Sequence, residues 1–301
     1  MKKMIELIKK YIDTGIQLPE YQVKKLLNNK SLFNTYIRKR AIAVKNGDKF
    51  YNYEINFIKY AIKNNYFNDK MIQSLVESYG YIIQFIVNPS EELKLVAVNE
   101  NGYAIEHIKN PSEEVQLVAV NNDGDAIYYI INNGIEPSEE VKFAAVNQSG
   151  RSIEYIMKTG IKPSEELQLA AVNQNGNAIE YIIERRIVPS EQVQLAAVNN
   201  EGYAIRHILK AGIEPSEEVQ LAAVNNDVDA IRYILRAGIE PSEQVQLAAV
   251  SNDSDTIRHI INNGIEPSEQ VQLTAVKKHI NAYYNIKNPY PSVIKYFYDN
   301  S

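Results

Sequence analysis

Histidine is the residue type in this chain best suited to acid–base or metal chemistry, because its pKa lies near neutrality. The chain has no cysteine, which excludes thiol nucleophiles, disulfides and cysteine-ligated metals. No Ser-His-Asp order, His-Glu-x-x-His helix or glycine-rich phosphate loop is present in the sequence. The four histidines are His107, His207, His259 and His279.

Three of these histidines share their sequence context with four tyrosines, and this context argues against metal binding. The residue before each of them is variable, and an isoleucine follows each of them. Because His and Tyr alternate freely at this place, we expect a packing or stacking row and no metal site. The tyrosines are Tyr129, Tyr155, Tyr181 and Tyr233.

Ser-Glu pairs recur eight times, always after a proline, and they are the second candidate for chemistry. A catalytic pair would have to differ from its copies, and none of the eight does. Serine followed by acids is instead typical of a helix start. The sequence therefore predicts no catalytic residue, no metal site, no cofactor and a protein that is not an enzyme.

The elements that carry these residues belong to an internal repeat. The tripeptide Pro-Ser-Glu is spaced first by 22 residues and then six times by 26 residues. A period of this length indicates a solenoid, a propeller or another array. The repeats begin at Pro89, Pro111, Pro137, Pro163, Pro189, Pro215, Pro241 and Pro267.

One repeat, residues 215–240, shows the periodicity of two short helices. Pro215 is expected in the first helical turn, where proline and acidic residues are favoured. The apolar residues of 230–235 recur at helical spacing, and Gly238 is expected to end the second helix. Helices this short are marginal alone, so they must stack. We expect an all-α fold, an α-solenoid of about ten helical hairpins including divergent caps.

The turn between the two helices has its own pattern. With Pro as repeat position 1, position 11 is almost always asparagine, which we expect to bond free carbonyls and to link adjacent repeats. Position 14 is mostly glycine, expected in the left-handed conformation that ends a helix. The asparagines are Asn99, Asn121, Asn147, Asn173, Asn199 and Asn225.

Charge divides the chain and suggests its organisation. The net charge is +8 over residues 1–88 and −13 over residues 89–301. We expect one continuous array: a basic, divergent helical cap at 1–66, acidic helical repeats at 67–288 and an aromatic-rich cap at 289–301. No signal peptide or membrane span is predicted, so an intracellular, cytoplasmic protein without a membrane partner is expected.

The positions that vary between otherwise similar repeats are the candidates for partner binding. Positions 15 and 18 lie three residues apart on the second helix and therefore share a face. They form either a solvated face with local ion pairs or a binding surface, since solenoids bind along extended faces. This variable stripe consists of Tyr103, Glu106, Asp125, Tyr128, Arg151, Glu154, Asn177, Glu180, Tyr203, Arg206, Asp229, Arg232, Asp255 and Arg258.

The cap at 1–66 holds a second candidate surface, a basic patch for an anionic partner. It consists of Arg38, Lys39, Arg40 and Lys45. A charge run of this length also fits a solvated helix face. The acidic array disfavours duplex nucleic acid, because such binding depends on phosphate neutralisation. The Arg and Tyr residues of the stripe could still stack on single strands.

The repeats resemble a tandem-repeat family of domains of unknown function whose units read "PSEEVQLAAVNQNGYALEYI". The resemblance covers residues 67–288, and the family occurs in bacteria, protists, giant viruses and phages. It implies a fold and no chemistry. The repeats also look like the one-base-per-repeat DNA-binding arrays of plant-pathogen effectors, although the repeat here is several residues shorter.

Three hypotheses follow for the function. The first is a protein-interaction repeat protein that binds a macromolecular partner along the solenoid surface. The second is a virus- or phage-encoded inhibitor that occupies a basic surface of a host defence protein. The third is modular nucleic-acid binding through the variable repeat loops. The sequence leaves the partner's identity and the oligomeric state open.

Overall fold

A computed structural model describes residues 18–301, and this part of the chain contains helices and no strand. The chain forms two compact units, residues 1–145 and 146–301, called here the amino-terminal and carboxy-terminal parts. The segment on which the expectation of no signal peptide rests lies outside the described residues. No helix within 18–301 is both long and apolar enough to cross a bilayer. The predicted boundaries at 66 and 288 stay predictions.

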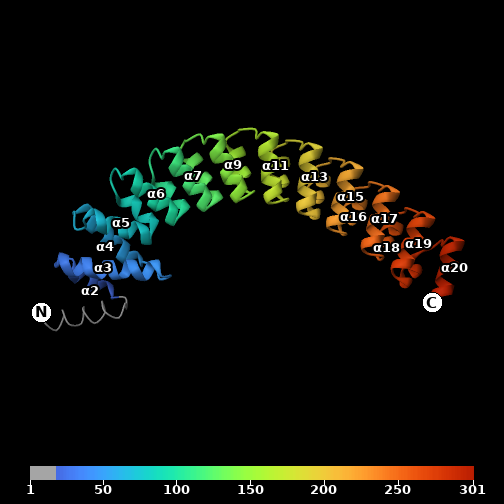
Figure 1. The fold of residues 1–301 in the computed structure, drawn as a ribbon, viewed down its shortest axis with the longest axis horizontal. Helices are drawn as coiled ribbons and strands as arrows, with labels where there is room; N and C mark the ends of the chain where they lie inside the picture. Colours follow the sequence, from blue (N-terminus) through green and yellow to red (C-terminus); the bar gives the residue numbers. More distant parts are fainter. Residues whose placement is uncertain (1–17) are drawn as a thin grey trace. The chain divides into compact units, whose positions relative to one another are not determined.

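In the amino-terminal part, the first helices of successive repeats contact one another in order, α5 with α6 and α6 with α7. Their second elements form the other layer, with η1 against η2 and η2 against α8 (Figure 1). Helix α9 crosses the boundary between the parts. The elements are α2 (Glu20–Leu26), α3 (Lys30–Lys45), α4 (Asn52–Lys63), α5 (Asp69–Ser78), η1 (Gly80–Phe85), α6 (Glu91–Glu100), η2 (Gly102–His107), α7 (Glu113–Asn122), η3 (Gly124–Ala126), α8 (Ile127–Asn132) and α9 (Glu139–Gln148).

The carboxy-terminal part has the same two layers. First helices α11, α13, α15, α17 and α19 each contact the next, and so do second helices α10, α12, α14, α16 and α18. The predicted all-α solenoid of helical hairpins is confirmed. The elements are α10 (Ser152–Lys158), α11 (Glu165–Gln174), α12 (Ala178–Glu184), α13 (Glu191–Asn200), η4 (Gly202–Ala204), α14 (Ile205–Lys210), α15 (Glu217–Asn226), α16 (Ala230–Arg236), α17 (Glu243–Asn252), α18 (Thr256–Asn262), α19 (Glu269–Lys278), η5 (Ile280–Asn285) and α20 (Pro291–Asn300).

The Ser-Glu pairs begin the first helices, as predicted. Ser216 is the N-cap of α15, and its Oγ accepts the backbone N–H of Val219 at 3.3 Å. The helix itself begins at Glu217, so Pro215 lies before the cap and not in the first turn as expected. The reason is that Ser216 has an extended backbone, with ψ 163°, which its capping side chain requires, and the carbonyl of Pro215 accepts a 3.0 Å hydrogen bond from the buried Gln220 side chain.

The core is built from six repeat positions, three on each helix. In α15 these are Val219, Ala223 and Val224, and all three are fully buried. In α16, Ala230, Ile231 and Ile234 are fully buried as well. A helix of seven to ten residues gains most of its stability from such packing. Stacking of hairpins therefore holds each helix in place.

Three repeats have a shorter second element. Where the spacing of repeats is 22 residues, a six-residue 3-10 segment replaces the second α-helix, as in η2 (Gly102–His107) and η5 (Ile280–Asn285). The segment η1 (Gly80–Phe85) is built in the same way. Four fewer residues leave too little chain for the last helical turn and its glycine stop.

The two recurring glycines have different roles, and one differs from the prediction. Gly238 has φ +79° and ends α16 in the left-handed conformation, as expected. Position-14 glycines do not have positive φ. At Gly150, a Cβ would lie 2.5 Å from the carbonyl oxygen of Ala171 in the next repeat. Position 14 is therefore glycine because adjacent repeats approach closely there, and not because a left-handed turn requires it.

The predicted ladder between adjacent repeats exists, but it comes from position 12. Asn226 Oδ1 accepts the N–H of Gly202 at 2.8 Å, and its Nδ2 donates to the carbonyl of Asn199 at 2.8 Å. The prediction that position 11 donates the bonds is therefore wrong, since Asn199 contributes its backbone carbonyl. The shift by one residue follows from helix geometry, because only position 12 faces the preceding repeat's turn.

A second ladder was not predicted from the sequence. Ser242 Oγ donates to Glu217 Oε1 in the preceding repeat at 2.5 Å, and Ser292 donates to Glu269 at 2.5 Å. The same serine hydroxyls cap their own helices or lie at their starts. The Ser-Glu pair thus joins one helix start to the next.

Candidate functional site

The variable stripe is exposed or half-buried at all fourteen of its residues. The two residues between positions 15 and 18 are buried in each repeat of the stripe. Around Arg232, the neighbours Ala230, Ile231 and Ile234 are fully buried. Positions 15 and 18 are therefore free to vary without disturbing the core. Position 18 lies on the second element of each repeat, and position 15 lies in the 3-10 segment or is the N-cap of the second helix. Each part of the chain carries its own section of the stripe.

In the amino-terminal part the stripe is aromatic and acidic. The ring of Tyr103 lies 5.5 Å from that of Tyr129 in the next repeat, and Tyr128 lies 5.2 Å from Tyr129. Burial raises the pKa of Tyr103, and a hydrogen bond to Asp123 raises this pKa further. Glu106 is exposed and Asp125 is half-buried. This section can offer aromatic faces and carboxylates, which suit cationic or aromatic partner groups.

The carboxy-terminal part begins its section with a network around Glu154. Glu154 forms ion pairs with Arg151 at 3.5 Å and Lys158 at 2.7 Å. Partial burial alone would raise the pKa of Glu154, but Lys158 and Arg151 outweigh it and lower this pKa. Both cations also lie over the Tyr155 ring, at 5.6 and 5.2 Å from its centroid.

The next two stripe residues, Asn177 and Glu180, contact side chains of the following repeat. Glu180 Oε1 lies 3.2 Å from His207 Nδ1 of the following repeat. Asn177 donates a short hydrogen bond to Glu201, also in the following repeat. These polar contacts occupy part of the surface and hold adjacent second helices together.

The last section, in α14, α16 and α18, is rich in arginine. Arg206 lies over the Tyr203 ring at 5.2 Å, and that ring contacts Tyr233 at 5.4 Å. Arg232 forms an ion pair with Asp229, three residues before it, at 3.3 Å. The equivalent pair of Asp255 with Arg258 is not formed among the described residues, and both side chains are exposed.

The pKa of His259 is affected by the arginines of this section. Burial lowers the pKa of His259, and the nearby charges of Arg258 and Arg232 lower it further. Asp229 acts in the opposite direction on this pKa, so the section carries exposed or half-buried charges of both signs.

The position-19 residues are half-buried, as expected for a packing row, but the rings of three of them contact position 15 of the preceding repeat and not one another. His107 contacts Tyr81 at 5.6 Å, Tyr129 contacts Tyr103, and Tyr233 contacts Tyr203. His107, His207 and His259 are all half-buried. Within residues 18–301, no three His, Cys, Asp or Glu side chains gather closely enough to hold a metal ion.

The predicted basic patch is not a single surface. Arg38 and Lys45 are exposed, and Lys45 lies 3.8 Å from Glu77. Lys39 is half-buried. Arg40 is 2% exposed and points into the interior, so it cannot contact an anionic partner. Within the Arg38-Lys39-Arg40 run, the α3 periodicity turns the third side chain to the buried face.

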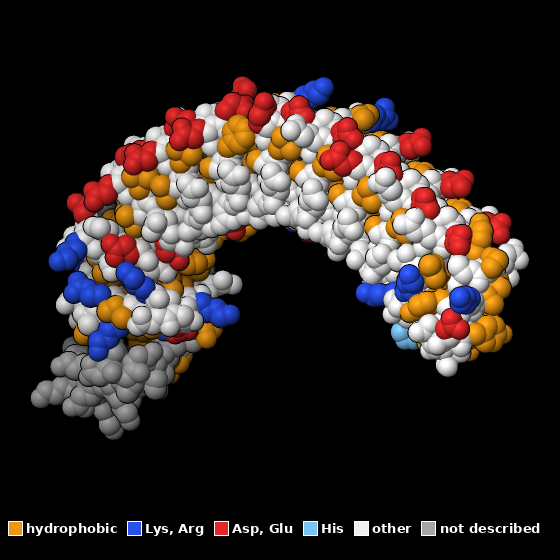
Figure 2. Space-filling view, turned by 45° about the vertical axis from the view of Figure 1, so that its right-hand side comes forward, with side chains coloured by type: hydrophobic (Ala, Val, Ile, Leu, Met, Phe, Trp, Pro, Cys, Tyr) orange, Lys and Arg blue, Asp and Glu red, His pale blue; other side chains and the backbone are white. Residues whose placement is uncertain are grey.

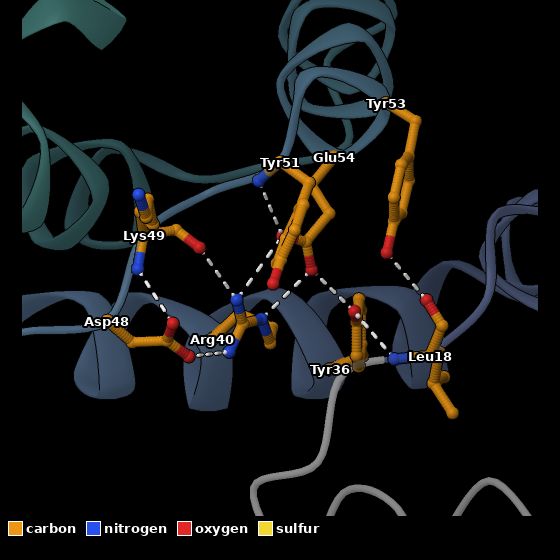
Figure 3. A network of polar contacts seen from close by, with 8 residues as sticks. All are labelled: Leu18, Tyr36, Arg40, Asp48, Lys49, Tyr51, Tyr53 and Glu54. Atoms are coloured by element: carbon orange, nitrogen blue, oxygen red, sulfur yellow. Dashed lines mark hydrogen bonds and ion pairs between the residues drawn. The ribbon is translucent and has the colours of Figure 1, made fainter.

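Arg40 belongs instead to a buried polar network between α3 and α4 (Figure 3). Its Nε donates to Glu54 Oε1 at 2.9 Å, and its Nη1 lies 2.5 Å from Asp48 Oδ2. Tyr36 donates its hydroxyl to Glu54 Oε1 at 2.5 Å, and Glu54 Oε2 accepts the N–H of Tyr51 at 3.0 Å. Glu54 is fully buried. Every oxygen of this buried carboxylate is therefore hydrogen-bonded.

The pKa shifts of Arg40, Tyr36 and Asp48 follow from the contacts of this network. Burial alone would lower the pKa of Arg40, but the hydrogen bonds to Glu54 and Asp48 outweigh it and raise this pKa. Burial and the Glu54 carboxylate raise the pKa of Tyr36. The hydrogen bond from Arg40 lowers the pKa of Asp48. The network keeps Arg40 charged and Tyr36 neutral, which is a structural role.

A row of exposed acids on the first helices was not singled out from the sequence as a surface. Positions 3 and 4 lie in the first turn of each first helix. Position 3 is an exposed glutamate in all eight Pro-Ser-Glu repeats, and position 4 is an exposed glutamate in five of them. Figure 2 shows acidic side chains, in red, recurring along the repeats. The acidic row consists of Glu91, Glu92, Glu113, Glu114, Glu139 and Glu140 in the amino-terminal part, and Glu165, Glu166, Glu191, Glu217, Glu218, Glu243 and Glu269 in the carboxy-terminal part.

Comparisons with known proteins add no family to this description. No protein-family model matches the sequence, and no curated protein matches it significantly.

Proposed function

We propose that this protein is a non-enzymatic interaction protein that binds a macromolecular partner along the second-helix surface of its repeats. One observation carries the proposal. Positions 15 and 18 are exposed or half-buried in every repeat of the stripe and vary in residue type, while the residues between them are buried and nearly constant. Packing does not require this variation, and an extended solenoid face is a common binding surface.

The arginine-rich section is the part of the stripe best suited to a test. Arg206, Arg232 and Arg258 occupy the same repeat position on α14, α16 and α18. Changing all three to Glu reverses the charge of this section. Folding should change little, because exposed substitutions such as those at Arg206 and Arg258 usually stay within about 0.5 kcal/mol each. Loss of the Arg232–Asp229 pair adds about a few tenths of a kcal/mol. Binding should weaken strongly, because like charges at an interface cost several kcal/mol.

The experiment is a pull-down from cell lysate with quantitative mass spectrometry of the retained proteins. Wild type, the triple variant and an Arg38→Glu/Lys39→Glu variant are compared after circular dichroism shows equal helix content. We expect the triple variant to lose the partner that wild type retains. Retention by the triple variant, together with loss by the Arg38→Glu/Lys39→Glu variant, would place the function in the amino-terminal residues instead.

A second candidate function rests on the acidic row. A single-sign row of carboxylates favours a partner with a basic surface. Together with the family resemblance, it supports a virus- or phage-encoded inhibitor of a host defence protein. Replacing the exposed position-4 residues Glu114, Glu140 and Glu218 by Gln tests it without touching the Ser-Glu ladder, because this variant would lose a basic partner and the arginine variant would not. Saturable binding of a single-stranded oligonucleotide at physiological salt would favour nucleic-acid binding over both.

A further inference from the structure

The amino-terminal part contains a groove of about 1030 Å³ that the variable stripe does not include. It is lined by the end of α4, the start of α5, the residues that follow η1 and the first turns of α6. Its apolar lining includes Ile62, Ile72, Phe85, Leu93 and Val96. The volume is at the upper limit of small-molecule pockets, which is roughly 1,000 Å³.

The groove lies where core positions of the repeat lose their cover. Position 5 exposes 1% or less in the seven following repeats, as Val115 and Leu167 do, but Leu93 is only half-buried. Position 20 shows the same difference, since Ile108 is 1% exposed and Ile86 is half-buried. Val87, which also lines the groove, is 86% exposed. Residues that elsewhere form the core are therefore open to another molecule here.

Opposite charges border the groove on different elements. Lys59 and Lys63 lie one turn apart on α4 and are both exposed. The Lys59 ammonium lies 5.6 Å from the centre of the Phe85 ring, and neither lysine forms an ion pair within the described residues. Asp69 and Glu92 line the groove from the first turns of α5 and α6.

We propose that this groove binds an amphipathic helix of a partner protein. Its apolar residues, at spacing i, i+3, i+4 and i+7, would cover Leu93, Ile86 and Phe85. Acidic residues along one edge would pair with Lys59 and Lys63, and basic residues along the other with Asp69 and Glu92. A helix laid in an apolar groove is a known mode of peptide recognition, and strand addition has no sheet edge to use within residues 18–301. This site goes beyond the stripe and is independent of it.

The test uses the full chain and a phage-displayed library of random 16-residue peptides. We expect the enriched peptides to share the apolar helical spacing with acidic residues on one flank. Fluorescence anisotropy then measures the affinity of a selected peptide. It should fall at least about tenfold for Lys59→Glu/Lys63→Glu, and similarly for Val87→Asp, because like charge and buried charge oppose binding. Peptide carboxylates changed to Lys should restore binding to the double variant.

Two matched controls should leave the affinity unchanged. Val188→Asp alters another exposed valine close before a repeat proline, and this valine does not line the groove. Lys109→Glu/Lys162→Glu makes the same charge change on exposed lysines outside the groove. The arginine variant of the stripe should also bind the peptide normally. Loss of the stripe partner and loss of the peptide can therefore be told apart.

Four results would overturn the proposal. The first is that no amphipathic peptides are enriched. The second is that the control variants lose as much affinity as the groove variants. The third is saturable binding of dodecanoate without peptide binding, which would assign the groove to a small amphiphile. The fourth is a lysine-specific chemical crosslink from Lys59 or Lys63 to Lys2, Lys3, Lys9 or Lys10, which would assign it to the chain's own amino terminus.

Discussion

Arg40 and Glu54 form the most costly interior contact to break in the amino-terminal part. Replacing Arg40 by Met leaves the fully buried Glu54 carboxylate without its cation, which should destabilise the fold by about 3–5 kcal/mol. Arg38→Met, on the exposed side of the same helix, should stay within about 0.5 kcal/mol. Urea unfolding measures both. An Arg40→Met variant as stable as wild type would contradict the buried network.

A pH titration tests the arginine-rich section at the same scale. The folded pKa of His259 lies below its ordinary value of about 6.5 because of burial, Arg258 and Arg232. The contribution of His259 to stability is therefore complete above pH about 6.5 and is lost as the pH falls through the folded pKa. By NMR, Arg258→Gln should raise the pKa of His259, and Arg206→Gln should not. If the pKa of His259 is the same in wild type, Arg258→Gln and Arg206→Gln, then Arg258 does not act on His259.

Individual residues also show what the sequence could not predict. Arg40 stands in a basic run that resembles a solvated helix face, and its partner Glu54 lies fourteen residues away. The signal that could have found it is Glu54 itself, the lone charged residue of the stretch 51–58. The variable stripe was predictable, because its exposure follows from helical periodicity within one repeat.

At the scale of the element, the helices were predictable and the contacts between their ends were not. Helix starts, the Gly238 stop and the buried faces depend on residues of a single repeat. The position-12 ladder and the position-14 glycine depend on the carbonyl and amide groups of an adjacent repeat. These contacts depend on the distance between neighbouring repeats in space, and that distance is set by the packed structure.

The close approach at position 14 predicts the effect of Gly150→Ala. The added Cβ would lie 2.5 Å from the carbonyl oxygen of Ala171, so adjacent repeats must separate. We expect a loss of about 1–3 kcal/mol in the free energy of unfolding. Ser254→Ala is the control, since position 14 already carries a Cβ there, and because it adds no atom it should cost clearly less than Gly150→Ala. Equal effects in thermal unfolding would show that position 14 is not a packing constraint.

The largest scale is the stack of repeats in the carboxy-terminal part, where the interfaces are nearly interchangeable. Removing residues 189–214 would bring α11 against α15 and α12 against α16. Asn226 could then bond the N–H of Gly176 and the carbonyl of Asn173, as Asn200 does in the intact chain. Ser216 could likewise donate to Glu165 in place of Ser190. The new interface would therefore keep both polar ladders and the same buried valine and alanine positions.

Nearest-neighbour energetics then predict that this 26-residue deletion stays folded and is slightly less stable, because only one repeat and one interface are lost. Removing residues 189–201 alone is the matched control. It deletes the first helix and its cap but keeps the second helix, which would have no first helix to cover its buried face. Circular dichroism and urea unfolding should show a cooperative transition for the full-repeat deletion and a severe loss for the half-repeat deletion. If the full-repeat deletion unfolds as well, the stability of this part depends on contacts beyond adjacent repeats.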